Sequence, residues 1–325
     1  MDTATTTRLR ELNRAFYTCF AAEFAASRGH RLNPGTLRFL ERARDAETIL
    51  DLGCGDGRLL RAVLRGQCLP RLRFYRGVDF SSPALEKASG SPSPSDHLGQ
   101  PGAAARLSRP PCAPDARSSS DEVTSMQWKQ DPDPNEGAAA GDVPAQRADP
   151  PRPEGSRVVD GQFILADLVD EDWTTRPGLA GLRFAVVACL ATLFHIPSRQ
   201  KRRALLERAA AMAEPGGMVV ISVWQFLHRE RFQRRIVPWS TAGLSETEVE
   251  EGDLLLDWRA GGHGLRYVHH YAVGELDEDI SGIGLRIVED YRSDGDTGDL
   301  SRYLVLRRDS SPEDRGCGSS MPMTE

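Results

Sequence analysis

Two patterns of hydrophobic positions alternate along this chain. Apolar residues spaced three and four apart predict amphipathic helices at 8–26, 58–64 and 199–213. Short continuous apolar runs predict buried strands at 48–52, 75–79, 162–167, 184–190 and 218–223, with two last strands expected at 266–272 and 301–307. Uninterrupted apolar strands that alternate with helices are typical of a parallel sheet with helices on both faces. We therefore expect an α/β fold with a mostly parallel seven-stranded sheet.

One stretch of the chain interrupts this alternation. Residues 88–157 hold 12 of the 21 prolines and show no apolar periodicity. A segment of this composition cannot bury enough apolar surface to offset its ordering entropy, so we expect a disordered insert, acting either as a passive loop or as a docking segment. Residues 309–325 are expected to form a disordered tail. The remaining residues, 1–87 and 158–308, predict a single domain.

Composition excludes several classes of protein. The mean hydropathy is −0.43, and no apolar run reaches the roughly 18 residues that would span a membrane. The N-terminus shows no basic stretch followed by an apolar one, so we expect no secretory signal and a cytoplasmic location. The cysteines contain no Cys-x-x-Cys pair, so neither a disulfide scaffold nor a zinc or other metal site is expected. They are Cys19, Cys54, Cys68, Cys112, Cys189 and Cys317.

The most informative stretch, residues 51–57, directly follows the first predicted strand and reads Asp-Leu-Gly-Cys-Gly-Asp-Gly. Glycines let the backbone approach a ligand closely where open α/β sheets bind nucleotides. Dinucleotide loops read Gly-x-Gly-x-x-Gly and bind a pyrophosphate, which Asp51 and Asp56 would repel. Acidic groups suit a ligand with an ammonium and a sulfonium. The loop resembles the first motif of the class I S-adenosylmethionine-dependent methyltransferases, which implies a Rossmann-like fold and cofactor contacts from Asp51, Gly53, Gly55 and Gly57.

Two further acids follow the next predicted strands. Asp79 lies 28 residues after Asp51, and in this superfamily an acid at that position accepts the hydroxyl groups of the cofactor ribose. Asp167 follows the third strand, where the corresponding acid meets the adenine amino group. Any single aspartate at a strand end can instead cap a helix. Three acids at successive strand ends after a glycine-rich loop favour cofactor binding.

Later segments resemble a narrower family, the tRNA wobble-uridine methyltransferases. The segments are Leu193-Phe194-His195, Val223-Trp224, Val237-Pro238-Trp239, the block Arg266-Tyr267-Val268-His269-His270-Tyr271 with Gly274-Glu275-Leu276 after it, and Phe24 to Arg28. The resemblance implies methylation of the carboxymethyl group of a modified wobble uridine, with tRNA as partner. It also implies a small zinc-binding activator subunit, as in eukaryotic members. This chain departs from the family pattern at Phe194, where the family has a second histidine.

A carboxylate acceptor sets the chemistry that the site needs. Carboxylates are ionised at neutral pH, so no general base is required, and positioning supplies much of the acceleration. The site instead needs donors that orient the acceptor, and the candidates are Arg28, His195, Arg266 and His269. Arg266 and His269 can alternatively form ordinary salt bridges on a surface strand. Trp224 and Trp239 can stack a base or belong to the core.

The charge distribution leaves the acceptor open. The chain carries a net charge of −6, but the insert and the tail each carry −3, so the remaining core is neutral. The densest basic clusters, 201–203 and 229–235, can contact phosphates or form solvated helix faces. Two other functions therefore stay open beside the tRNA methyltransferase. They are a small-molecule O- or N-methyltransferase of the same fold and a non-catalytic cofactor-binding partner protein.

Overall fold

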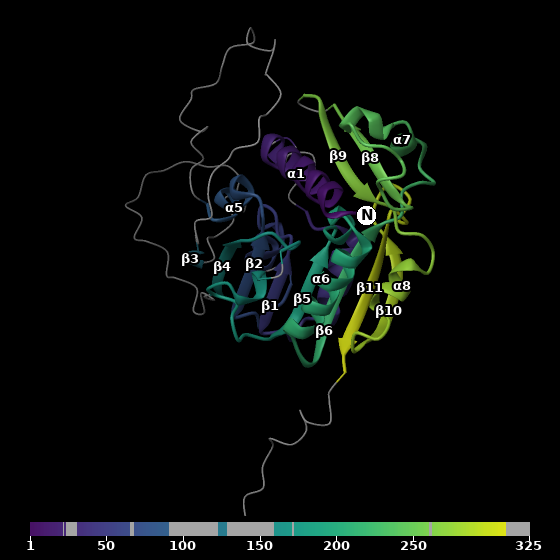
Figure 1. Ribbon diagram of the computed structural model, residues 1–325. Coiled ribbons are helices and arrows are strands. Elements are labelled where there is room, and N and C mark those ends of the chain that lie inside the picture. The colour runs from purple at the N-terminus through teal and green to yellow at the C-terminus, as the bar shows by residue number, and fades with distance from the viewer. Residues whose placement is uncertain are drawn as a thin grey trace, which may run out of the picture.

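Figure 1 shows the computed structural model of the chain, in which an eight-stranded sheet forms the centre of the fold. The structure describes residues 1–21, 23, 31–65, 68–90, 123–128 (backbone only), 159–170, 172–259 and 262–309. The strand order is β10-β11-β6-β5-β1-β2-β4-β3. The strands are β1 (Thr48–Leu52), β2 (Phe74–Asp79), β3 (Val123–Trp128), β4 (Val159–Leu165), β5 (Phe184–Leu190), β6 (Ala213–Trp224), β10 (Leu285–Ser293) and β11 (Ser301–Arg308).

The directions of the strands confirm the predicted α/β class. β1 pairs in parallel with β2 and β5, and the parallel pairing continues from β2 to β4 and from β5 to β6. β11 runs antiparallel to both of its neighbours. Seven of these strands form the mostly parallel sheet that the apolar pattern predicts. The eighth, β3, pairs antiparallel with β4 at the sheet edge and lies inside the predicted insert.

Helices cover both faces of this sheet. Successive strand residues point to opposite sides, and because both sets are apolar, each face needs a layer of helices to bury it. In β1, Leu50 packs in the core on the side of α6 (Arg199–Met212) and α8 (Glu275–Ile280). Ile49 packs in the core on the side of α3 (Pro34–Arg42) and α4 (Arg58–Leu64). β5 and β6 alternate in the same way. The residues that follow the strand ends are therefore held by a rigid, fully buried layer.

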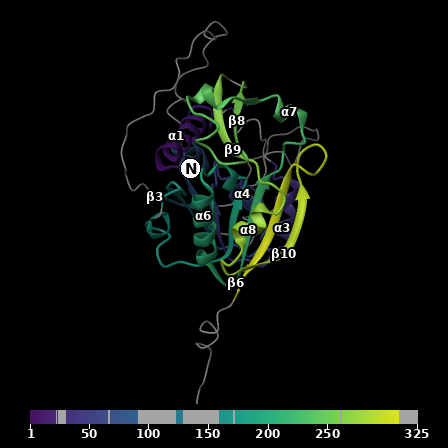
Figure 2. The same ribbon diagram turned by 45° about the vertical axis from the view of Figure 1, so that its right-hand side comes forward.

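A second, three-stranded antiparallel sheet lies at the end of the main sheet that also carries α1 (Thr3–Cys19), as Figures 1 and 2 show. Its strands are β7 (Ile236–Val237), β8 (Asp253–Trp258) and β9 (Gly264–His269). Leu9 of α1 packs with Leu255 and Tyr267 in a separate core. The strand predicted at 266–272 thus belongs to this small sheet, and the main sheet instead ends in β10, which the apolar pattern missed.

Several predicted boundaries change in the structure. The first helix begins at Thr3, where the Asp2 carboxylate accepts a hydrogen bond from the Thr5 amide, and it ends at Cys19. Ala88 ends the helix α5 (Ser82–Ala88) and so does not belong to the insert. The rest of the insert outside β3, and the tail after residue 309, lie outside the described residues. Cys19 is disulfide-bonded, contrary to expectation. Among the described helices, none is long and apolar enough to cross a membrane.

Candidate active site

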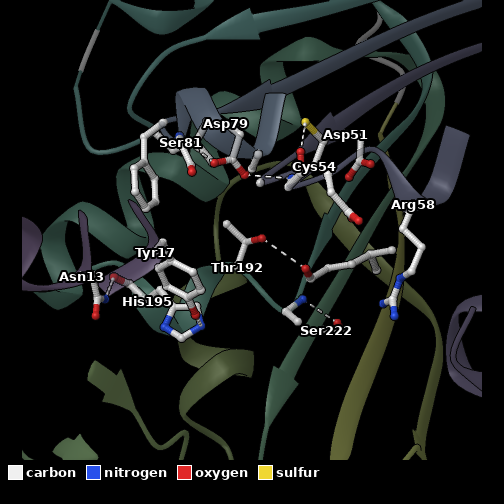
Figure 3. Close-up of a pocket in the computed structure, with 18 of the residues that line it drawn as sticks. Asn13, Tyr17, Asp51, Cys54, Arg58, Asp79, Ser81, Thr192, His195 and Ser222 are labelled. Carbon is white, nitrogen blue, oxygen red and sulfur yellow. Dashed lines mark hydrogen bonds between the residues drawn. The ribbon is translucent and has the colours of Figure 1, made fainter. Parts of the chain in front are cut away.

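A cleft of about 870 Å³ lies where the carboxyl ends of the parallel strands meet α1. Asp51, Asp79 and Asp167 all line it, although 116 residues separate the first from the last in the chain. His195, from the turn η3 (Leu193–His195) after β5, lines the same cleft. Figure 3 shows Asp79 on one wall and His195, with Tyr17 beside it, on the opposite wall. The sheet thus brings together the acids and the histidine that the sequence singles out.

The glycine-rich loop forms the floor of this cleft. Gly53 has φ +76°, and a Cβ there would lie 2.1 Å from the Thr192 hydroxyl oxygen. Gly55 has φ +55°, and a Cβ there would meet nothing within 4 Å. Its backbone therefore borders open space, as a close approach to a ligand requires. Gly57 does not line the cleft, and a Cβ there would lie 2.9 Å from the Phe163 ring, so its role is close packing of α4 on the sheet.

Asp79 and the residues around it form a polar recess in the cleft. The Asp79 carboxylate accepts hydrogen bonds from the amides of Gly55 (2.8 Å) and Ser81 (2.9 Å). Burial raises the pKa of Asp79 above its ordinary value. The Ser81 hydroxyl oxygen is buried and makes no hydrogen bond within the described part of the protein. A buried, unsatisfied hydroxyl next to a carboxylate fits a ligand that supplies hydroxyl groups, as a ribose does.

Asp51 is the most strongly perturbed acid of the cleft. It is the next-to-last residue of β1, is 4% exposed, and accepts a hydrogen bond from the Tyr75 hydroxyl at 2.7 Å. Burial, together with the nearby Asp79 carboxylate, raises the pKa of Asp51 to about 7 despite this hydrogen bond. A cationic ligand beside Asp51 would relieve this penalty. The ammonium and sulfonium of S-adenosylmethionine provide such a charge.

Asp167 is held by two arginines from α1 that the sequence did not single out. Its Oδ2 accepts from Arg10 Nε at 2.5 Å and from Arg14 Nη2 at 2.9 Å, and its Oδ1 accepts from the Val169 amide at 3.0 Å. A carboxylate offers about four lone-pair positions, so Oδ1 keeps one for a further donor such as an adenine amino group. Arg10 and Arg14 are four residues apart on one helix face, a spacing that could have suggested a shared partner.

His195 is oriented by contacts at both ring nitrogens. Its Nδ1 lies 3.2 Å from the Tyr267 carbonyl oxygen, and its Nε2 lies 2.7 Å from the Tyr17 hydroxyl. A carbonyl oxygen only accepts, so the proton of the neutral ring is on Nδ1 and Nε2 accepts from Tyr17. Asn13, one helical turn before Tyr17, donates to the His195 and Tyr267 carbonyl oxygens, both at 3.1 Å. The sequence analysis missed Tyr17 and Asn13.

The structure separates two of the predicted donors from the cleft. Arg266 is 5% exposed, and its guanidinium carbon lies 5.3 Å from the centre of the Trp224 ring. His269 is fully buried, with Nδ1 2.8 Å from Asp253 and Nε2 2.7 Å from Glu275. Neither residue is among the described residues that line the cleft. The geometry therefore does not support these two residues as donors that orient the acceptor. Both lie on β9, and their side chains are buried inside the protein instead of facing the cleft. Arg28 lies outside the described residues.

The two basic clusters, for which the sequence left phosphate contact and a solvated helix face open, are largely paired within the described part of the protein. Arg202 is 1% exposed and lies 3.3 Å from Glu250 and 3.6 Å from Glu275. The Arg203 guanidinium donates to backbone carbonyls at the end of α8. In the second cluster, Arg229 and Arg231 pair with aspartates of the loop between β10 and β11. These arginines mainly join elements of the fold.

The two candidate stacking tryptophans take different positions. Trp239 is buried in the core between α1 and the small sheet. Trp224 lines the cleft, and its ring stacks on Phe194 with centroids 4.9 Å apart. Trp224 therefore forms part of the wall beside His195, whereas the structure assigns Trp239 to the core.

Comparison with known proteins agrees with this geometry. A family model described as a methyltransferase domain matches residues 24–289. Similar structures include an S-adenosylmethionine-dependent methyltransferase from Methanosarcina mazei, with 14% identity over 86% of this chain and 99% of that chain and a TM-score of 0.48. The CcbJ methyltransferase from Streptomyces caelestis shows 15% identity over 93% and 99%, with a TM-score of 0.47. No curated protein matches the sequence.

The acids and glycines that line the cleft fit S-adenosylmethionine. Asp79 and Ser81 would hold its ribose, Asp167 its adenine, and Asp51 would face its charged end. When bound, the cofactor supplies an electrophilic methyl group on a sulfonium. The chain belongs to the methyltransferase-domain family and uses S-adenosylmethionine as its cofactor.

Proposed function

We propose that this chain methylates a modified wobble uridine in tRNA, with the carboxymethyl group as the acceptor that the sequence resemblance implies. The observation that carries the proposal is the meeting of two family-like segments at the cleft. The Tyr267 carbonyl of the Arg266–Tyr271 block orients the ring of His195, 72 residues away in the chain. A surface-strand role for this block would not require such a contact.

Cationic side chains around the cleft support an anionic acceptor. Among the described residues, the arginines and lysine that line it are Arg10, Arg14, Arg58 and Lys87. The Arg14 side chain is 50% exposed although it contacts Asp167. Partly exposed cations at the mouth of a site attract phosphates at low ionic strength. A need for a zinc-binding activator subunit and a cytoplasmic location stay predictions.

A second candidate function is favoured by the hydrogen bond between Tyr17 and His195. A carboxylate acceptor needs no proton acceptor, whereas a hydroxyl or amine does. The internal pairing of the two basic clusters also leaves fewer charges for a large RNA surface. The second candidate is therefore an O- or N-methyltransferase that acts on a small molecule.

The test is transfer of label from methyl-labelled S-adenosylmethionine. The full-length protein is incubated with bulk tRNA and, separately, with a nucleotide-free metabolite extract, and both products are analysed for label. Label in nucleosides of the tRNA supports the first proposal, and label only in the extract supports the second candidate. Absence of label in both pools, while the protein binds the cofactor, contradicts methyl transfer to either. Protein-free reactions serve as the blank, and the Asp79→Ala variant, which should bind the cofactor more weakly, serves as the low-transfer control at limiting cofactor.

A further inference from the structure

We propose that Tyr17 is a catalytic residue whose hydroxyl contacts the acceptor and relays its proton to His195, so that the acceptor is a group that carries a proton at neutral pH, a hydroxyl or an amine. The inference deepens the second candidate function, methyl transfer to a hydroxyl or an amine, and rests on it. It competes with the carboxymethyl acceptor of the first proposal, and the chemistry of the product decides between the two.

The position of Tyr17 is the first support for this inference. Tyr17 lines the cleft from α1, across from the wall that carries Asp79 and Ser81 (Figure 3). Its ring packs edge-on against Phe80, with centroids 6.1 Å apart, and against His195 at 5.3 Å. The hydroxyl is therefore held beside the cofactor site by a packed ring rather than by a mobile side chain.

The direction of the hydrogen bonds gives the relay its polarity. The neutral His195 ring carries its single N–H proton on Nδ1, which donates to the Tyr267 carbonyl. Nε2 is therefore left as an acceptor for the Tyr17 hydroxyl proton. A phenol that donates in this way can also accept a hydrogen bond at its oxygen. Such an oxygen complements a group that donates a proton and repels a carboxylate. Asn13 keeps the geometry by bonding the His195 and Tyr267 carbonyls and, through its own oxygen, the Tyr267 amide at 2.9 Å.

Two of the donors predicted for a carboxylate acceptor, Arg266 and His269, are not among the described residues that line the cleft. Arg266 lies against aromatic rings, and both nitrogens of His269 are engaged by carboxylates. The cations that do line the cleft include Arg10 and Arg14, and Arg10 is hydrogen-bonded to Asp167 and Asp170. His195, the partner of Tyr17, lies beside Trp224 on the wall of the cleft, with ring centroids 6.5 Å apart.

The proposed step balances in atoms and charge. The acceptor atom forms a bond to the methyl carbon while the carbon–sulfur bond breaks and its electron pair stays on sulfur. The acceptor proton moves to the Tyr17 oxygen, and the proton of Tyr17 moves to Nε2 of His195. The positive charge of the sulfonium is replaced by that of the imidazolium, and the second ring proton stays on Nδ1, hydrogen-bonded to the Tyr267 carbonyl throughout. Solvent then removes the extra proton.

Other charged groups surround this pair and contribute to its titration. Those on the elements packed against it are Arg10 and Arg14 on α1, Asp79 at the end of β2, Asp167 after β4, Arg202 on α6, and Arg266 on β9. None of them contacts Nε2 in the hydrogen bonds of the described residues, where Tyr17 is the partner. A pH effect that belongs to the pair must therefore disappear when either member is replaced.

The first arm of the test uses the chemistry of the labelled product. Methyl esters release methanol in mild alkali, whereas methyl ethers and methylamines do not. We expect the label transferred from S-adenosylmethionine to tRNA or to the extract to resist alkali. Label released as methanol identifies a carboxylate acceptor and overturns the inference, although methyl transfer itself then stands. No transfer at all overturns the proposed function instead.

The second arm compares Tyr17→Phe, which removes only the hydroxyl, with His195→Gln and the double variant. The substrate is whichever pool, tRNA or extract, accepted label in the first arm. Each single variant should lower kcat by about 10²-fold. The double variant should be no slower than the slower of the two single variants. Cofactor affinity should be unchanged in Tyr17→Phe. The wild-type rate should rise with pH to a plateau, and the variants should lose this rise. Additive losses, or a Tyr17→Phe rate equal to wild type, overturn the relay.

Discussion

The buried carboxyl group of Asp51 makes the stability of the cofactor-free protein depend on pH. Its pKa is about 7 in the folded protein against an ordinary value of 3.8, so between these values the folded state binds more protons than the unfolded state. Stability should therefore fall as pH rises from about 4 to 7. At 1.36 kcal/mol per pKa unit, the shift is worth about 4 kcal/mol at most.

The Asp51→Asn variant removes this ionisation and keeps an oxygen that can accept the Tyr75 hydroxyl bond. Urea unfolding of the cofactor-free variant should give a stability close to wild type at pH 4 and a gain of several kcal/mol at pH 8. Asp56→Asn is the matched control, since Asp56 lies in the same loop but is paired with Arg61 at 2.6 Å, and it should not change the pH slope. An Asp51→Asn effect of the same size at both pH values would refute the reasoning.

The same ionisation should couple to cofactor binding. A cation beside Asp51 favours the charged carboxylate, so S-adenosylmethionine should bind more tightly as pH rises through 7. Calorimetric titration of the wild type should show this trend, with proton release on binding below pH 7. Asp51→Asn should bind more weakly with no such trend. A wild-type affinity that is flat across this range would place the cationic groups away from Asp51.

Three further predictions concern the loop, the ribose site and the buried histidine. Gly53→Ala should destabilise the fold by about 2–4 kcal/mol in urea unfolding, because of its φ of +76° and the contact with Thr192, whereas Gly55→Ala, which meets nothing, should cost only about 1–2 kcal/mol. Asp79→Ala should weaken cofactor binding about tenfold or more by calorimetry, and an unchanged Kd would remove Asp79 from the ribose site. Burial disfavours a charged His269, but hydrogen bonds to its two carboxylate partners outweigh this and raise its pKa above 6.5. Its stabilising effect should be complete below pH 6.5 and be lost as pH rises through the raised pKa, and His269→Gln should flatten this part of the stability profile.

The parts of the fold that local pattern determines were predicted well. The strand at 48–52 and the helix at 58–64 have the same bounds in the sequence prediction and in the structure. The strand is a short buried apolar run and the helix is amphipathic, and the glycine-rich loop between them marks the end of one and the start of the other. The acids at the strand ends meet in one cleft because parallel strands end at the same edge. β10 was missed because most of its residues are exposed at the sheet edge, which leaves no buried apolar run to detect.

The parts of the site that depend on distant partners could not be read from the sequence. A histidine in the Arg266–Tyr271 block has the same local sequence whether it points to a substrate or inward. Only the fold reveals that His269 lies between Asp253 and Glu275, with Arg202 nearby from α6. Tyr17 was likewise taken only as part of a helix, since its partner His195 is 178 residues away.

The N-terminal helix is consequently part of the active site. Arg10 reaches Asp167 at the adenine end of the cleft, while Asn13 and Tyr17 hold His195 at the acceptor end. These residues lie three and four positions apart, so one face of α1 makes both sets of contacts. The face is held in place by Leu9, which packs with the small sheet. Because β9 of that sheet also supplies the carbonyl that orients His195, the small sheet positions the helix and the histidine together. A disturbance of α1 should therefore affect cofactor binding and methyl transfer at once, whereas loss of the Tyr17 hydroxyl should affect transfer alone.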